Sequence, residues 1–95
     1  MLFDVDQTEE FGKWFDKQQL KTQVLVSDRI GRMINSGHMG NSKALGKGLF
    51  EFKWKNGLRI YFFFKKNKII LLNGGKKNAQ KKDLEKAHRL KKRHS

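Results

Sequence analysis

The sequence has no cysteine, few acidic residues in its second half, and no apolar run long enough to cross a membrane. Without cysteine the chain cannot form a disulfide, a thiolate zinc site or a cysteine nucleophile, which favours a reducing compartment. The longest apolar runs, residues 60–64 and 69–72, are strand-sized and far shorter than the roughly 20 residues of a membrane helix. Asp4 and Asp6 follow the first apolar residues at once, unlike in a secretory signal, so we expect a cytoplasmic protein that does not act at a membrane.

Positive charge dominates the chain and lies almost entirely in its second half. Among 95 residues, 22 Lys and Arg stand against nine Asp and Glu, a net charge of +13. Residues 1–42 hold five bases and six acids (net −1), whereas residues 43–95 hold 17 bases and three acids (net +14). Such a one-sided field attracts polyanions, with nucleic acid first, ahead of an anionic membrane or an acidic protein. Eleven aromatic residues can build one small core, so a single domain over residues 1–95 is expected.

The first half predicts a short strand followed by a helical hairpin. Residues 2–6 alternate as a strand does, and Thr8 is placed to cap a helix with Phe11, Trp14 and Phe15 on one face. We expect Asp16 to cap a second helix that ends near Gly37. The apolar stripe of this second helix comprises Leu20, Val24, Val26, Ile30, Met33 and Ile34.

After a loop expected over residues 37–48, the apolar period changes from 3.6 to 2 and predicts a β-hairpin. A two-residue Asn-Gly loop would mix charged and apolar side chains on both faces. A three-residue loop over residues 55–57, with a left-handed Gly57, keeps the faces distinct and sets Phe52 opposite Ile60. The pairs predicted on the other face are Lys53 with Arg59 and Glu51 with Tyr61.

A third strand is predicted over residues 69–72 and is expected to end at residues 73–75, Asn-Gly-Gly. A last helix from Asn78 to about Arg93 has a basic end and only a weak packing stripe, formed by Gln80, Leu84, Ala87 and Lys91. These elements predict an α+β fold in the order β-α-α-β-β-β-α. The helical hairpin packs on one face of a small, largely antiparallel sheet, the other face is polar and open, and the C-terminal helix is basic.

The polar face of the predicted hairpin is a candidate site. Directly opposed like charges destabilise a sheet, and a phosphate between Lys53 and Arg59 would relieve that conflict. Glu51 can accept a proton, and the Tyr61 phenol can stack on a base or donate a hydrogen bond. The competing interpretation is a solvated sheet face whose charges keep the protein soluble.

Neither a metal nor a cofactor is predicted. Three dispersed acids in the basic half cannot supply a magnesium site, and the three histidines lack the spacing of metal ligands. Residues 73–77 are rich in glycine and lysine but lack the pattern of a nucleotide-binding loop.

Several segments together resemble the RelE/ParE toxin superfamily, and the nearest match is its HigB-like branch, also called addiction-module killer proteins. The segments are Glu51-Phe52-Lys53, residues 57–62 (GLRIYF), residues 71–80 (LLNGGKKNAQ), residues 83–87 (DLEKA), and Thr8-Glu9-Glu10-Phe11 with Trp14. The resemblance implies the compact RelE-like fold and the toxin of a type II toxin–antitoxin system. It also implies a metal-independent, ribosome-dependent endoribonuclease, or mRNA interferase, that cleaves translated mRNA and arrests growth. The implied partners are mRNA, the 70S ribosome and a cognate antitoxin that is acidic or carries a helix-turn-helix.

The resemblance also assigns roles to residues. Arg59 matches the strand arginine of the family and is expected to stabilise transition-state charge, whereas Lys53 stands where the branch commonly has Arg. Either Glu51 or a lysine of lowered pKa is expected to act as the base. The catalytic candidates are Arg59, Lys53, Glu51, Lys77 and Tyr61. The candidates for RNA binding are Lys55, Lys76, Gln80, Lys81, His88, Arg89 and Lys92.

Two alternatives remain open. The ParE branch uses this scaffold to inhibit DNA gyrase and lacks the catalytic cations. In a non-catalytic RNA- or ribosome-binding module, Tyr61, Phe63 and the basic helix would hold RNA by stacking and phosphate contacts.

Overall fold

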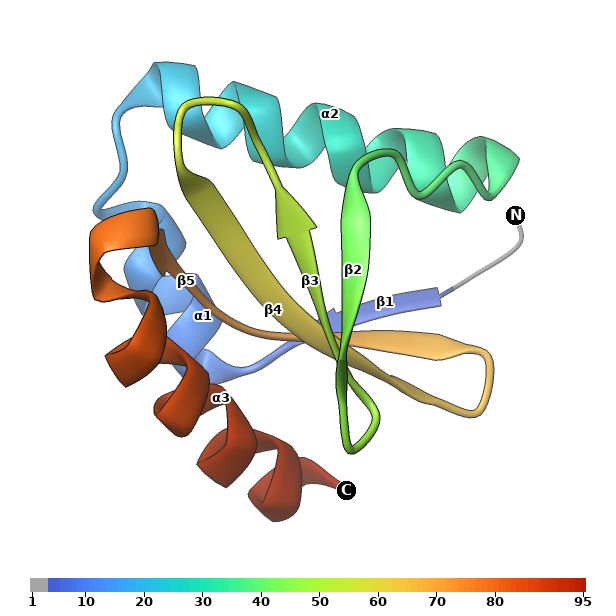
Figure 1. Cartoon of the computed structure of the whole chain (residues 1–95). Coiled ribbons are helices and arrows are strands. Elements are labelled where there is room, and N and C mark those ends of the chain that lie inside the picture. Colours follow the sequence, from blue (N-terminus) through green and yellow to red (C-terminus); the bar gives the residue numbers. More distant parts are fainter. Residues whose placement is uncertain (1–3) are drawn as a thin grey trace.

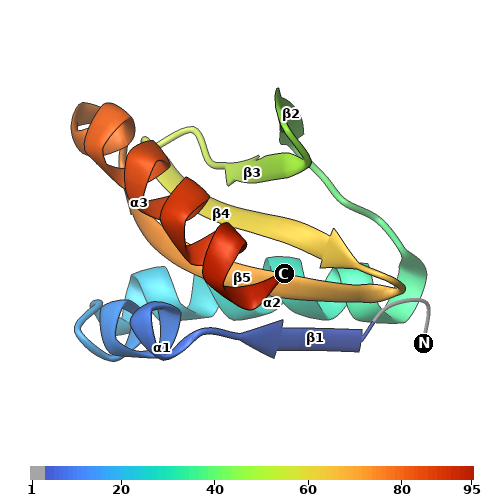
Figure 2. The same cartoon turned by 90° about the horizontal axis from the view of Figure 1, so that it is seen from below.

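A five-stranded mixed sheet separates two layers of helix (Figures 1 and 2). The computed structural model describes residues 4–95. The strands lie in the order β1-β5-β4-β3-β2, in which β1 is parallel to β5 and every other neighbouring pair is antiparallel. The strands are β1 (Asp4–Gln7), β2 (Ser42–Gly46), β3 (Leu49–Lys53), β4 (Leu58–Lys65) and β5 (Lys68–Lys76). The helices are α1 (Glu9–Asp16), α2 (Leu20–Ser36), the short 3₁₀ helix η1 (Lys77–Ala79) and α3 (Gln80–His94).

The α+β class, the predicted helical hairpin and the basic C-terminal helix are confirmed. Thr8 caps α1 as predicted, because its hydroxyl accepts the Phe11 N–H at 3.0 Å and donates to the Leu72 carbonyl at 2.6 Å. Gly37 ends α2 in the left-handed conformation, with a φ of 72°. The predicted opening strand corresponds to β1, and its first two residues, 2 and 3, lie outside the described residues.

The prediction that Asp16 caps the second helix is wrong. Asp16 is the last residue of α1, and the extended N-cap of α2 is Gln19, which makes no side-chain capping hydrogen bond. The backbone amides of Lys17 and Gln18 still donate to the carbonyls of Trp14 and Phe15. The chain has therefore not left α1 when it passes Asp16, and the second helix starts later.

The hairpin register is confirmed at each predicted pair. β3 and β4 set Phe52 opposite Ile60, and on the other face they set Lys53 opposite Arg59 and Glu51 opposite Tyr61. The Trp54 amide donates to the Leu58 carbonyl and the Gly57 amide donates to the Trp54 carbonyl, each at 3.1 Å. Gly57 is left-handed with a φ of 93°, so the loop has the predicted three residues.

The segment expected to be a loop contains an additional strand. β2 pairs antiparallel with β3 at the edge of the sheet, with Lys43 opposite Glu51 and a register shift between Ala44 and Gly46. Its sequence, SKALG, carries little strand propensity. The open edge of β3 supplies the hydrogen bonds that stabilise β2. The sequence of residues 42–46 gives no sign that such an edge lies beside it.

The expectation of an open, polar second face is wrong, because α3 covers it. One core lies between the sheet and the α1–α2 hairpin, and a second core lies between the sheet and α3. The buried residues of the first core are Phe11, Val26, Met33, Phe52, Leu58, Ile60, Phe62, Ile69 and Leu71. Those of the second are Leu49, Tyr61, Phe63, Ile70, Leu72, Ala87 and Leu90.

The third strand of the meander is longer than predicted. β5 continues through both glycines to Lys76, and Gly74 and Gly75 pair with Ile60 and Arg59. A Cβ on Gly74 would lie 2.7 Å from the Trp14 ring, and one on Gly75 would overlap the Asp83 carboxylate. The two glycines therefore do not end the strand. They allow α1 and α3 to approach it closely.

Candidate functional site

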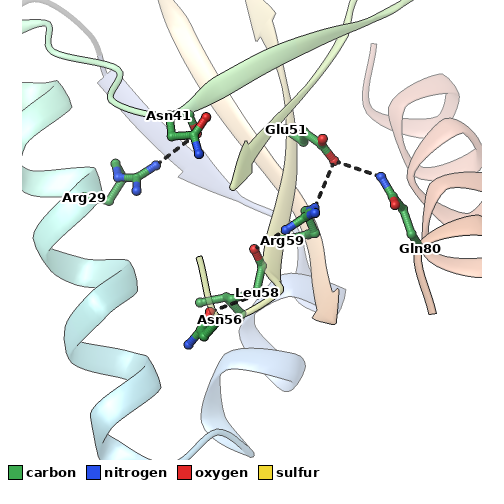
Figure 3. Close-up of polar contacts among 7 residues, drawn as sticks. All are labelled: Arg29, Asn41, Glu51, Asn56, Leu58, Arg59 and Gln80. Carbon is green, nitrogen blue, oxygen red and sulfur yellow. Dashed lines mark hydrogen bonds and ion pairs between the residues drawn. The ribbon is translucent and has the colours of Figure 1, made fainter. Parts of the chain in front are cut away.

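Three of the five predicted catalytic residues, Arg59, Glu51 and Tyr61, lie beneath the first turns of α3, where β3, β4 and β5 meet that helix. β4 supplies Arg59 and Tyr61, β3 supplies Glu51, β5 supplies Asn73, and α3 supplies Gln80. Figure 3 shows Arg59 and Gln80 converging on the Glu51 carboxylate. The hairpin alternation places these strand residues on one face, because successive side chains point to opposite sides of a sheet.

Arg59 and Glu51 form a buried ion pair. The Arg59 Nε lies 3.8 Å from the Glu51 Oε2, and the two residues are only 7% and 1% exposed. The Gln80 Nε2 donates to the same carboxylate oxygen at 3.5 Å, and the Arg59 Nη1 donates to the Leu58 carbonyl at 3.3 Å. Glu51 thus offsets the like charges of Lys53 and Arg59. Phosphate binding between Lys53 and Arg59 stays a prediction, because the carboxylate already offsets part of the repulsion.

Tyr61 is a core residue in this conformation. Burial, followed by the nearby carboxylates of Glu51 and Asp83, raises the pKa of the phenol to about 12, against the opposing effect of Arg59. The phenol is therefore neutral at physiological pH and can donate a proton in a hydrogen bond. Because Tyr61 and Phe63 are both buried, neither ring can stack on a base while α3 stays in place, which corrects the stacking interpretation.

Three buried polar atoms on this face have no hydrogen-bond partner within residues 4–95: Arg59 Nε, Tyr61 Oη and Asn73 Oδ1. Asn73 lies directly opposite Tyr61, so the three belong to one cluster. A buried polar group without a hydrogen bond costs about 1–3 kcal/mol, and of the three only Arg59 Nε has an ion-pair partner, Glu51. A ligand that supplied donors and acceptors here would recover part of that free energy.

Asp83 and Asn73 also belong to this cluster, although neither was predicted from the sequence. The Asn73 side-chain amide donates to the Asp83 carbonyl at 3.1 Å, and the Asp83 carboxylate lies against Gly75, the partner of Arg59. Burial raises the pKa of the Asp83 carboxyl, and Lys86 and Lys82 oppose that shift. Asp83 follows Gln80 by three residues and therefore shares its helical face, which is the signal that could have identified it.

Other predicted residues lie at the turn end of the β3–β4 hairpin. Lys55 is in the turn, Lys76 pairs with Leu58 at the end of β5, and the Lys77 amide donates to the Gly57 carbonyl at 2.8 Å. All three lysines are exposed. The fold thus brings two segments, about 20 residues apart in the chain, together as a basic rim beside the Arg59 cluster.

The remaining predicted RNA-binding residues run along α3. Lys81, Arg89 and Lys92 are exposed, and His88 is half-buried. Lys81 and Lys92 are eleven residues apart, about 16 Å along a helix. This row extends away from the Arg59 cluster, so the structure does not gather these residues at one point.

Within residues 4–95 no three His, Cys, Asp or Glu side chains lie close enough to hold a metal ion. None of the helices in that range combines the length and the apolar character that a membrane crossing needs.

The family of phage-derived Gp49-like proteins matches residues 13–94. An uncharacterized protein of Haemophilus influenzae is 30% identical over 94 residues, which cover 95% of this chain and 94% of that protein.

Solved structures resemble the fold at low identity. A mutant of the E. coli toxin RelE in the free state has a TM-score of 0.74 and 16% identity, with 94% of this chain and 98% of that chain covered. A chain of the RelB–RelE antitoxin–toxin complex of Methanococcus jannaschii has a TM-score of 0.69 and 12% identity, with 82% and 96% covered. A chain of the ParDE system of P. aeruginosa has a TM-score of 0.61 and 11% identity, with 79% and 96% covered.

Proposed function

Because the chain belongs to the Gp49-like family, a family of RelE/ParE-type toxins, we propose that it is the toxin of a type II toxin–antitoxin system and cleaves translated mRNA on the ribosome without a metal. The observation that carries this proposal is the Arg59–Glu51 pair next to the basic rim of Lys55, Lys76 and Lys77. A carboxylate can accept the 2′-proton, a cation can stabilise the charge that develops on the phosphate, and a basic rim attracts the RNA backbone. Membership of the HigB-like branch stays a prediction.

The proposed reaction uses a nucleophile that RNA itself supplies. The 2′-oxygen attacks the adjacent phosphorus, the bond from phosphorus to the 5′-oxygen breaks, and the products end in a cyclic phosphate and a 5′-hydroxyl. Glu51 takes the 2′-proton, and Arg59, with Lys53 opposite it, stabilises the negative charge that develops on the phosphate. The leaving 5′-oxygen takes a proton from solvent or from a neighbouring acid and becomes the 5′-hydroxyl.

The proposal requires the first turn of α3 to move when RNA binds, because Glu51 and Tyr61 lie beneath it. Polar contacts between this part of α3 and the sheet include the 3.5 Å bond from Gln80 to Glu51 and the 3.1 Å bond from Asn73 to the Asp83 carbonyl. The first is long for a hydrogen bond, so its loss costs little. The apolar anchors, Ala87 and Leu90, lie further along the helix and can stay in place.

The exposed basic residues of α3 suit the proposed binding of mRNA and the ribosome. Lys81, Arg89 and Lys92 face solvent and suit the phosphates of mRNA or of the ribosome. The cognate antitoxin is proposed to be an acidic or helix-turn-helix protein, in keeping with the net positive charge of +13. A reading frame for such a protein beside this gene is the expected observation.

The decisive experiment removes the Arg59 guanidinium. We expect Arg59→Ala to lower mRNA cleavage about 10²- to 10³-fold, the loss typical of one charge-stabilising donor, and to relieve growth arrest. Because Arg59→Ala leaves Glu51 buried without its partner, Arg59→Lys keeps the charge and serves as the second variant. Lys66→Ala, in the distant β4–β5 turn, removes one charge as a matched control and is expected to stay toxic.

Mapping mRNA ends after a short induction separates the alternatives. Cuts within translated codons support the nuclease. DNA breaks or altered supercoiling without such cuts would instead identify a ParE-like gyrase inhibitor, and growth arrest without either would identify a non-catalytic RNA- or ribosome-binding module. Full toxicity of folded Arg59→Lys and Arg59→Ala proteins would refute the site.

A further inference from the structure

A groove lies between α2 and the β3–β4 turn, at the same end of the hairpin as the proposed site. It has a volume of about 470 Å³, and of the described residues that line it four are basic and none is acidic. The basic residues are Lys21, Arg29, Lys53 and Lys55, and Leu25 and Trp54 supply apolar surface. Asp28, the acid that precedes Arg29, is paired with Arg32 at 2.9 Å. The groove is therefore positively charged and partly aromatic.

Arg29 and Trp54 form a fixed stack in this groove. The centre of the Arg29 guanidinium lies 4.3 Å from the centroid of the Trp54 ring. Its Nη1 donates to the Asn41 carbonyl and its Nη2 to the Lys53 carbonyl, each at 3.3 Å. Figure 3 shows Arg29 reaching from α2 towards Asn41. Two backbone carbonyls thus hold a planar cation against a half-buried indole.

The positive charge of Arg29 is only partly neutralised by its acidic neighbour, Asp28. Burial lowers the pKa of the guanidinium, the nearby Arg32 lowers it further, and Asp28 opposes both effects only in part. A negative group entering the groove would therefore be stabilised by Arg29 as well as by the two exposed lysines, Lys21 and Lys55.

We propose that this groove binds one nucleotide of the single-stranded RNA substrate, with its base stacked on the Trp54–Arg29 pair and its phosphates held by Lys21 and Lys55. The inference rests on the proposed function, which makes RNA the substrate. Aromatic rings and guanidinium planes are the surfaces on which proteins stack unpaired bases, and lysines beside them track the backbone. An acidic peptide would satisfy the lysines but would leave the aromatic surface unused.

The hairpin connects this groove to the proposed cleavage site. Lys53 contributes to the groove, and its pairing partner across β3 and β4 is Arg59. In Figure 3, Arg29 lies on the α2 side of the hairpin and the Arg59–Glu51–Gln80 cluster on the α3 side. An RNA strand that passes over the β3–β4 turn would reach both, so the groove would hold a nucleotide that flanks the scissile phosphate.

Tryptophan emission provides a test that does not depend on cleavage. The chain has two tryptophans, Trp14 and Trp54, and only Trp54 lies in the groove. A short 2′-O-methyl oligouridylate, which cannot be cleaved, is titrated into the full chain, and an abasic oligomer of equal length and charge is the matched probe. We expect a saturable quench with the oligouridylate only, which persists in Trp14→Phe and disappears in Trp54→Phe.

Substitutions in the groove test its contribution to RNA affinity. Loss of one base–aromatic stack costs roughly 1–3 kcal/mol, so Trp54→Leu should weaken binding of the oligouridylate by about tenfold, measured by anisotropy of a labelled probe. Lys21→Gln should also weaken binding, whereas Lys66→Gln at the far end of the hairpin should not.

Equal quenching by the abasic oligomer, or no saturable quenching, would refute the groove as a base-stacking site. Quenching by an acidic peptide in place of RNA would replace the proposal with a protein-docking surface. The titration and the cleavage assay are read together to keep the two proposals distinguishable, and Arg59→Lys is expected to retain the quench. In the wild-type chain, quenching without mRNA cleavage would refute the nuclease alone. Cleavage that Trp54→Leu leaves unchanged, with no quenching, would refute the groove alone.

Discussion

At the scale of single residues, burial gives neighbouring side chains of the hairpin very different chemistry. Lys53 and Arg59 are directly opposed, but only Arg59 has a buried carboxylate beside it. The pairing follows from alternation and turn geometry, so the sequence sufficed to predict it. The ion pair and the enclosure of Tyr61 depend on where α3 lies, and no periodicity in the hairpin encodes that position.

Tyr61 is the only tyrosine of the chain, so an alkaline titration followed by phenolate absorbance in the near ultraviolet reports it alone. We expect its ionisation near pH 12 rather than near 10, because burial disfavours the phenolate. A raised pKa in the folded state stabilises the protein fully below pH 10, the unfolded value, and this contribution is lost as the pH rises from 10 to about 12.

Tyr61→Phe is the control for this titration. Since the hydroxyl has no hydrogen-bond partner within the described residues, its removal should not lower the free energy of unfolding at neutral pH. The absorbance change should disappear. Ionisation of wild-type Tyr61 near pH 10, in protein that is still folded by circular dichroism, would contradict the buried environment.

At the scale of elements, prediction succeeded where the signal was local. The Thr8 cap, the Gly37 terminus and the three-residue turn each depend on a few adjacent residues. It failed for β2 and for the packing of α3. β2 exists because β3 offers an edge. α3 packs through the predicted Leu84 and Ala87 and also through Leu90, so the error was to expect it to leave the second face of the sheet open.

The Thr8 hydroxyl connects the start of α1 to β5. Thr8→Val keeps the volume but leaves the Phe11 amide and the Leu72 carbonyl without their side-chain partner. We expect a loss of about 2 kcal/mol in the free energy of unfolding, measured by urea denaturation, which combines a lost cap with a buried unpaired group. Thr8→Ser retains the hydroxyl and should lose less, so equal losses in the two variants would show that packing, not the cap, dominates.

At the scale of the whole molecule, charge and scaffold are divided between the halves of the chain. The first 42 residues carry a net charge of −1 and form β1, α1 and α2, while the rest carries +14 and forms the other strands and α3. Composition alone predicted this division. It did not show that α2 contributes Arg29 and Lys21 to a basic groove, because helices distant in sequence meet the hairpin only after folding.

This division of charge predicts which residues make RNA affinity depend on salt concentration. Each phosphate contact on single-stranded RNA contributes about −0.7 to the slope of log affinity against log salt. We expect Lys81→Gln with Lys92→Gln to flatten the slope for an uncleavable oligoribonucleotide by about 1.4. Lys13→Gln with Lys17→Gln on the α1 side removes the same total charge and should leave it unchanged. Equal flattening by both pairs would show that net charge, not the basic half, governs binding.

The adjacent glycines of β5 make the two helical layers separately accessible to substitution. At Gly74 the chain faces Trp14 of α1, and at Gly75 it faces Asp83 of α3. A methyl group at Gly74 would press against α1, and one at Gly75 would press against α3, the helix above the Arg59 cluster. Two neighbouring positions in one strand therefore allow the stability of the protein and the closure of its proposed site to be altered independently.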